Sequence, residues 1–175
     1  MNFRAQLLEA IGLATLAHAG QTRKGSDDPY VIHPIRVARC LQDAPLPEGV
    51  SRESCILAAV LHDILEDTAV PRAVLVEKFG EAIVSIVDEL TQDKSLPQAE
   101  RKQQMLDDCA TMSPSAQVVK LADRLDNMRE MGCMPGEFIA RYCNEARVML
   151  TALNGACPIL ESEIAAIIAN YDEVT

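Results

Sequence analysis

Apolar residues recur three and four positions apart along most of the chain, and short polar stretches with proline or glycine separate these runs. Such spacing is typical of helices that bury one face. No stretch has the alternation expected of a β-strand, and there is no internal repeat. Helices are predicted over residues 3–19, 31–41, 51–67, 71–79, 82–90, 97–110, 114–129, 137–153 and 158–171. The pattern therefore predicts one all-α domain over residues 1–175, a bundle of about eight or nine helices.

The most apolar stretch of the chain lies in its first half. Residues 55–61 follow one another without a polar side chain, and a helix that is apolar on every side is a buried helix. His62 and Asp63 come next, and Glu66 and Asp67 follow after two further apolar residues. Because unpaired charges away from water are very costly, these four side chains need partners.

The spacing of these four residues predicts a site with two parts. In a continuous helix, His62 and Glu66 share one face, and Asp63 and Asp67 share the neighbouring face. A cation above the arc between the two faces would be reached by both His62 and Asp63. Glu66 and Asp67 would lie one turn further along, about 6 Å away, where they can act as acid and base. The alternative is that all four are solvated residues at a helix end, with His62 packed in the core.

Two further polar residues interrupt apolar helical segments, and they suggest how the first four are partnered. His33 lies between Val31-Ile32 and Pro34-Ile35, and Asp123 lies in the apolar run after Val118. Alone, His33 would be a core histidine and Asp123 the partner of an arginine. Together with His62 and Asp63, they form a set of two imidazoles and two carboxylates from three helices. Such a set suits a divalent first-row cation and leaves positions open for water and substrate.

Composition and charge narrow the classes of function. Apolar residues make up 49% of the chain and charged residues 24%, as in an ordinary globular protein. The formal net charge of −10 argues against nucleic acid and anionic membranes as partners. A small phosphorylated ligand would need a local cluster of lysine, arginine or metal.

The cysteines and the N-terminal residues indicate in which cellular compartment the protein is expected. None of the six cysteines forms a Cys-x-x-Cys pair, so a zinc ribbon or a thioredoxin site is not expected. The first residues do not have the pattern of a signal peptide, and no apolar run reaches the ~20 residues of a membrane span. The expectation is a cytoplasmic protein with reduced thiols.

The order His33…His62-Asp63…Asp123 resembles the His…His-Asp…Asp pattern of the HD-domain phosphohydrolases. Longer stretches resemble the hydrolase domain of the RelA/SpoT alarmone enzymes, over residues 17–23, 29–34, 61–68 and 119–129. Residues 91–97 and 100–102 resemble the small stand-alone alarmone hydrolases of the metazoan SpoT-homologue type. The resemblance covers about residues 3–153, and the chain stops where a synthetase domain begins in the long enzymes, so hydrolysis alone is expected.

The resemblance implies a reaction and a cofactor. Members of this family hydrolyse the 3′-pyrophosphate of (p)ppGpp to GDP or GTP and pyrophosphate, usually with Mn²⁺. By position in the motifs, the metal ligands would be His33, His62, Asp63 and Asp123. Glu66 and Asp67 match the pair that handles the attacking water.

The resemblance also implies contacts with the nucleotide. Arg23 and Lys24 match basic residues that contact the purine end, and Asn127 matches a residue near the ribose and phosphates. Tyr142 lies where stand-alone members carry a tyrosine that contacts the substrate, and Lys94 is expected to bind it as well. Further cations that would offset the charge of the ligand, unless they form ordinary surface ion pairs, are Lys120, Arg124 and Arg129.

Three positions within the motifs receive no chemical role. His18 is expected to order the first loop by a hydrogen bond, Tyr30 is assigned no chemistry, and Asp126 occupies a variable position.

Two other functions remain open on the sequence. The same site would fit another phosphate ester, such as NADPH or a nucleoside monophosphate. A catalytically inactive HD module that binds a nucleotide or a protein is the third possibility, although such a module would be expected to lose a metal ligand or the Glu66-Asp67 pair. The sequence does not indicate an oligomeric state.

Overall fold

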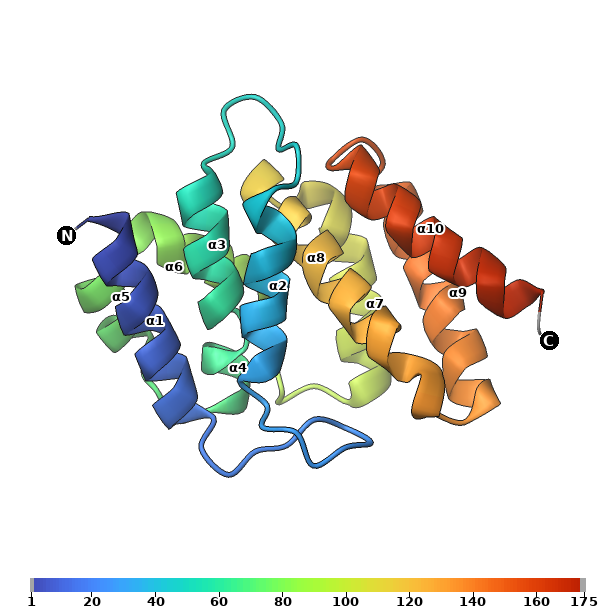
Figure 1. The fold of residues 1–175 in the computed structure, drawn as a ribbon, viewed down its shortest axis with the longest axis horizontal. Helices are drawn as coiled ribbons and strands as arrows, with labels where there is room; N and C mark the ends of the chain where they lie inside the picture. The colour runs from blue at the N-terminus through green and yellow to red at the C-terminus, as the bar shows by residue number, and fades with distance from the viewer. Residues whose placement is uncertain (1, 174–175) are drawn as a thin grey trace.

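The structure is a computed structural model that describes residues 2–173. Within that range it contains no β-strand, and its only β-bridge joins Thr22 to Pro29. The predicted all-α class is confirmed (Figure 1). Nine of the helices are eight residues or longer: α1 (Phe3–Ala17), α2 (Ile32–Gln42), α3 (Arg52–Leu61), α5 (Arg72–Phe79), α6 (Glu81–Leu90), α7 (Gln98–Asp108), α8 (Pro114–Glu130), α9 (Gly136–Ala152) and α10 (Pro158–Asp172). A single turn, α4 (Ile64–Asp67), and two 3₁₀ turns, Cys109–Thr111 and Met131–Cys133, complete the described helices.

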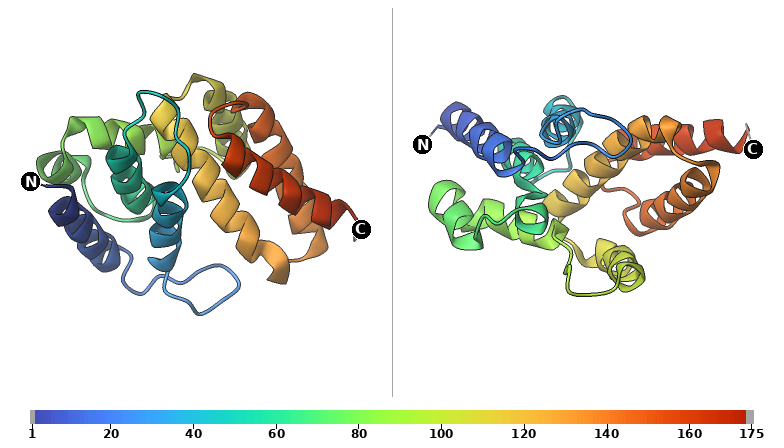
Figure 2. Two further views of the ribbon diagram at one scale, coloured as in Figure 1. Left: turned by 45° about the horizontal axis from the view of Figure 1, so that its top comes forward. Right: turned by 90° about the horizontal axis from the view of Figure 1, so that it is seen from below.

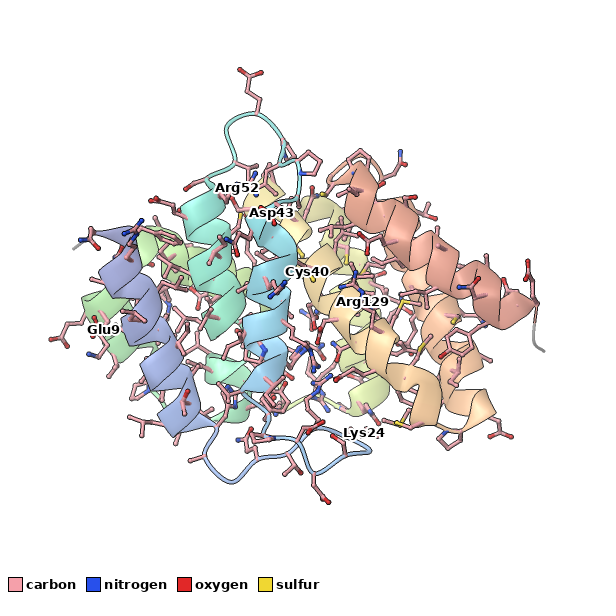
Figure 3. The ribbon with its side chains drawn as sticks, in the orientation of Figure 1. Glu9, Lys24, Cys40, Asp43, Arg52 and Arg129 are labelled. Carbon is pink, nitrogen blue, oxygen red and sulfur yellow. The ribbon has the colours of Figure 1, made fainter. Side chains whose placement is uncertain are left out.

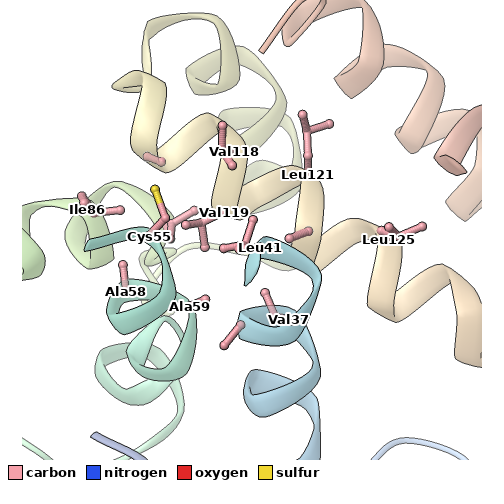
Figure 4. Close-up of a cluster of buried hydrophobic side chains, with 14 of the residues drawn as sticks. Val37, Leu41, Cys55, Ala58, Ala59, Ile86, Val118, Val119, Leu121 and Leu125 are labelled. Carbon is pink, nitrogen blue, oxygen red and sulfur yellow. The ribbon is translucent and has the colours of Figure 1, made fainter. Parts of the chain in front are cut away.

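Helix α3 lies at the centre of the molecule, as its sequence predicts. Residues 55–61 are all buried, and α1, α2, α6 and α8 pack around them. Figure 4 shows Ala58 and Ala59 of α3 close to apolar side chains of α2 and α8. The small alanine side chains let the neighbouring helices approach closely, so the end of α3 is held from several sides.

The end of α3 differs from the prediction of one helix over residues 51–67. The helix ends at Leu61, His62 and Asp63 form a turn, and α4 begins at Ile64. In a continuous helix the carbonyl of Ala59 would accept the N–H of Asp63. Here the Nδ1 of His62 hydrogen-bonds to that carbonyl at 2.7 Å, so a side chain competes for the backbone acceptor.

The loop from His18 to Val31 runs below α2, α4 and the end of α8 (Figure 1). His18 confirms its predicted role, because its Nδ1 hydrogen-bonds to Oε1 of Gln21 at 2.9 Å. The amide of Gln21 in turn donates to the backbone carbonyl of Asp67 at 2.9 Å. This chain of bonds ties the loop to α4.

The C-terminal part of the described chain covers the other side of α8. Helix α10 packs against α8 and α9, and α7 packs against α9 (Figure 2). All six cysteines are free thiols. Among the described residues, no helix is long and apolar enough to cross a membrane.

Candidate metal centre and substrate cleft

Four predicted ligands from three parts of the chain meet below the centre of the bundle. His33 lies in the first turn of α2, His62 and Asp63 form the turn after α3, and Asp123 lies in the middle of α8. The Nε2 of His33 is 3.2 Å from Oδ1 of Asp123 and 3.8 Å from Oδ2 of Asp63. The Nε2 of His62 is 3.0 Å from Oδ2 of Asp63 and 3.8 Å from Oδ1 of Asp123.

Hydrogen bonds on the far side of each imidazole turn its Nε2 toward this centre. The Nδ1 of His62 faces the carbonyl of Ala59, so it carries the hydrogen and leaves a lone pair on Nε2. The Nδ1 of His33 lies 2.7 Å from Oδ2 of Asp126. The Nε2 of His62 is buried and has no hydrogen-bond partner. A buried acceptor without a partner, beside another imidazole and two carboxylates, fits a divalent cation. Ligand atoms of His33, His62 and Asp123 lie within 4.8 Å of one another, close enough to share one ion.

The electrostatics of the four residues also favour a cation. Burial alone would lower the pKa of His62, but Asp63 and Asp123 outweigh that effect and raise it well above its ordinary value. Burial alone would raise the pKa of Asp123, but Lys120 and the two imidazoles hold it well below its ordinary value. The carboxylates are thus ionised, and a metal would take the place of protons on the imidazoles.

Neighbouring side chains hold the two carboxylates in place. The hydroxyl of Tyr30 donates to Oδ2 of Asp63 at 2.6 Å, although the sequence analysis assigned Tyr30 no chemistry. Oδ1 of Asp123 accepts a hydrogen bond from Nδ2 of Asn127 at 2.6 Å, and Oδ2 of Asp123 accepts one from Nζ of Lys120 at 3.1 Å. These contacts are typical of residues that orient ligands.

Asp126 contacts a predicted metal ligand, His33, although the sequence assigned it no role. It is 2% exposed, and besides His33 it binds the guanidinium of Arg36 through two hydrogen bonds of 2.9 and 3.1 Å. The position lies within the motif of residues 119–129 but was interpreted as a variable one. Its spacing was an available indication, since Asp126 lies one turn after Asp123 on the same helix face.

Glu66 and Asp67 lie on α4, and both line the same cleft as three of the predicted metal ligands, His33, Asp63 and Asp123. The carboxylate of Glu66 accepts the N–H of Gln92 at 3.1 Å, and burial raises the pKa of this carboxyl group above its ordinary value. Asp67 forms an ion pair with Lys94. Lys94 therefore lies beside the acid–base pair.

The cleft has a volume of about 320 Å³ and extends from the ligands toward α7 and α9. Of the residues predicted from the sequence, it brings together His33, Asp63, Glu66, Asp67, Asp123, Asn127 and Tyr142, and also Lys120 and Arg124. Arg129 lies elsewhere: it pairs with Glu163 and contacts the sulfur of Cys40 (Figure 3). Of the two alternatives for Arg129, the surface ion pair is the one that the structure supports.

Arg23 and Lys24 line a smaller hollow next to the cleft, with Asn127 and Tyr142 in both walls. The guanidinium of Arg23 donates to Glu130 at 3.0 Å and to Oδ1 of Asn127 at 2.7 Å. The ammonium of Lys24 lies 4.6 Å from the ring centre of Phe138. Arg23 is thus joined through Asn127 to the predicted metal ligand Asp123.

The chain matches the family described as HD domain over residues 10–147. It belongs to the HD-domain family. Within that family it is similar to guanosine-3′,5′-bis(diphosphate) 3′-pyrophosphohydrolase MESH1, with 41% identity to the human protein and 37% to the mouse protein. Each of these alignments covers 91% of this chain and 91% of the relative.

Structural comparison agrees with the sequence comparison. The fold resembles that of a protein described as a metazoan ortholog of SpoT that hydrolyzes ppGpp and plays a role in starvation responses, with a TM-score of 0.86 and 31% identity over 95% of both chains. The chain is also 35% identical to a probable GTP pyrophosphokinase of Mycobacterium leprae. That alignment covers 82% of this chain and 18% of the longer enzyme.

Proposed function

We propose that this protein is a metal-dependent hydrolase that removes the 3′-pyrophosphate of guanosine alarmones, (p)ppGpp, and yields GDP or GTP and pyrophosphate. The observation that carries the proposal is the convergence of two histidines and two aspartates beside the Glu66–Asp67 pair in one cleft. The similarity to the MESH1 proteins over 91% of the chain supports the choice of substrate.

A divalent first-row metal bound at this centre supplies Lewis acidity toward a phosphoryl oxygen. We take the metal to be Mn²⁺, and the residues that would hold it are His33, His62, Asp63 and Asp123. The unpartnered Nε2 of His62 is the structural support for this set. Asp126 and Tyr30 keep His33 and Asp63 in position.

Glu66 is the residue we assign to proton transfer from the attacking water. Its carboxylate is oriented by the N–H of Gln92, and its raised pKa brings it closer to the range of an efficient general base. Asp67 would act with it, and its ion pair with Lys94 keeps its carboxylate at the edge of the cleft. Water attacks the phosphorus attached to the 3′ oxygen, and the bond between that phosphorus and the 3′ oxygen breaks. Glu66 takes a proton from the attacking water and returns it to the departing 3′ oxygen, which becomes the 3′ hydroxyl of GDP or GTP.

The nucleotide would be held from two sides. We assign Arg23 and Lys24 to the purine end, and the hollow that they line next to the cleft supports this assignment. Asn127 would contact the ribose and phosphates, and Tyr142 and Lys94 would complete the contacts. The charge of −10 leaves nucleic acid and membranes as poor partners, and we expect the protein to act in the cytoplasm.

A panel of substrates tests the proposal. Release of phosphate and of pyrophosphate is measured for ppGpp, pppGpp, NADPH and simple nucleotides, with Mn²⁺ present. Pyrophosphate from the two alarmones is the expected result. Orthophosphate from NADPH alone would instead make the protein a phosphatase, and nucleotide binding without turnover would make it an inactive module.

A further inference from the structure

The wall of the cleft formed by α7, α8 and α9 carries more positive charge than its neighbours neutralise. Glu145 of α9 is approached by Lys102 at 2.7 Å, by Arg124 at 3.8 Å and by Arg141 at 3.9 Å, so three cations share one carboxylate. Arg101 also lines the cleft, and its side chain forms no hydrogen bond or ion pair with the described residues; its backbone N–H donates to the carbonyl of Pro97. In a chain with a formal charge of −10, this concentration of cations is unusual.

Two of these arginines have side-chain nitrogen atoms that make no hydrogen bond. The Nη1 of Arg124 and the Nε of Arg101 are buried without a hydrogen bond. Arg124 is 4% exposed, and its guanidinium lies 4.0 Å from the ring centre of Tyr142, which holds it in the cleft. Buried guanidinium donors without acceptors are costly, and they fit a ligand that supplies anionic oxygens.

We propose that Arg101 and Arg124, with Lys102 and Lys120, form a subsite for the terminal phosphate of the 3′-diphosphate, the one that leaves as part of pyrophosphate. This inference rests on the proposed function. The cluster begins at the metal centre itself, because Lys120 binds Asp123 at 3.1 Å. The phosphate nearest to the one under attack is its own terminal phosphate, whereas the ribose separates the 5′-phosphates from it.

The subsite explains a preference of the enzyme for a 3′-diphosphate over a 3′-monophosphate ester as substrate. A 3′-monophosphate would reach the metal centre but leave Arg101 and Arg124 without acceptors. Sites that leave buried polar groups unpaired reject an analogue more strongly than sites that lose an apolar contact. We therefore infer that the four cations determine the specificity of the enzyme for a 3′-diphosphate.

Arg101→Gln is the first test, because Arg101 has no ion-pair partner that the substitution would strand. We compare kcat/KM for ppGpp with that for guanosine 5′-diphosphate 3′-monophosphate, and we measure binding of inorganic pyrophosphate and orthophosphate to the Mn²⁺-loaded protein by calorimetry. The expected result is a loss of about tenfold to a hundredfold for ppGpp and for pyrophosphate, the range for one charge-assisted hydrogen bond. The kcat/KM for guanosine 5′-diphosphate 3′-monophosphate and the affinity for orthophosphate should change less than threefold.

Arg124→Gln and Arg124→Lys extend the test, with melting temperature as the check on folding. Lysine should restore part of the loss, since it keeps the charge but not the planar fork of donors. Arg129→Gln is the matched control, because Arg129 lies on the same helix in a surface ion pair. This substitution should leave kcat/KM and binding affinity unchanged for all four compounds.

Three outcomes would overturn the subsite. One is an equal loss for diphosphate and monophosphate compounds. Another is weakened binding of GDP with unchanged binding of pyrophosphate, which would assign the cluster to the 5′-phosphates. The third is pyrophosphate binding that does not depend on Arg101 in a protein that still hydrolyses ppGpp. If ppGpp is not hydrolysed but pyrophosphate binding does depend on Arg101, the subsite stands and the proposed function fails.

Discussion

At the scale of single residues, the site depends on side chains that orient the metal ligands as much as on the ligands. Asp126 faces the Nδ1 of His33 and is itself held by Arg36, so the imidazole is fixed from behind. A carboxylate in this position keeps the hydrogen on Nδ1 and makes Nε2 a better ligand.

Asp126→Asn should weaken metal binding by about 10- to 100-fold, the cost of losing an orienting partner of a ligand. Titration of the metal-free protein with Mn²⁺ measures the affinity, and the absorption spectrum of the Co²⁺ form reports the ligand geometry. Arg36→Gln is the control, because it keeps the bond between Asp126 and His33. Equal losses in the two variants would mean that Asp126 acts only through its ion pair with Arg36.

Glu66→Gln should lower kcat by about 10²- to 10⁴-fold while metal affinity stays unchanged, as expected for loss of a general base. A variant that no longer binds metal would show instead that Glu66 is a ligand.

The same substitution should stabilise the metal-free protein at neutral pH. The pKa of Glu66 is raised in the folded state, so the folded protein holds this proton more tightly than the unfolded chain does. Stability is therefore lost as pH rises from the unfolded pKa, ordinarily 4.5, through the raised folded value. The melting temperature of Glu66→Gln should exceed that of the wild type at pH 7, and the difference should vanish below pH 4. A lower melting temperature at pH 7 would contradict this account.

At the scale of elements, the buried helix α3 delivers His62 and Asp63 to the site. Leu61 is fully buried and is the last residue of α3, directly before His62. Leu75 is equally buried but lies on α5, and it lines neither the cleft nor the hollow. Substitution of each leucine in turn therefore distinguishes an effect of lost core packing from an effect on the site.

Leu61→Ala and Leu75→Ala should each cost about 2–5 kcal/mol of stability, the usual range for a cavity in a core. Thermal unfolding should show similar drops in melting temperature. Only Leu61→Ala should also weaken Mn²⁺ binding, because its cavity adjoins the turn that carries the ligands. If Leu75→Ala weakens metal binding as much, the end of α3 has no special part in placing the ligands.

The helices and the site were predictable from the sequence to different degrees. Periodicity predicts the bundle because apolar residues must face inward, and it placed the long helices correctly. It did not predict the break at His62, because that break comes from a side chain that takes a backbone carbonyl. Tyr30 and Asp126 were missed for a related reason, since their contacts join segments far apart in the chain.

Over the whole chain, which is acidic, four cations line the cleft between a centre suited to a metal and the wall of α7 and α9: Arg101, Lys102, Lys120 and Arg124. Because a metal would bind the folded chain and not the unfolded one, metal binding should add to the stability of the whole fold.

Removal of metal by a chelator should therefore lower the melting temperature as well as activity. Mn²⁺ at 100 times its dissociation constant adds about 2.7 kcal/mol to the stability of the fold. Thermal unfolding across a series of Mn²⁺ concentrations measures the effect, and Asp63→Ala should be insensitive to Mn²⁺. A wild-type melting temperature that does not change with Mn²⁺ would contradict a metal centre at these residues.

In the proposed reaction, water attacks the phosphorus of the 3′-diphosphate that is bound to the 3′ oxygen. Hydrolysis of ppGpp in ¹⁸O-labelled water, followed by mass spectrometry of the products, shows which bond breaks. We expect one GDP and one pyrophosphate per turnover, with the label in the pyrophosphate and none in the 3′ hydroxyl of GDP. Label in that hydroxyl, or release of orthophosphate in place of pyrophosphate, would contradict it.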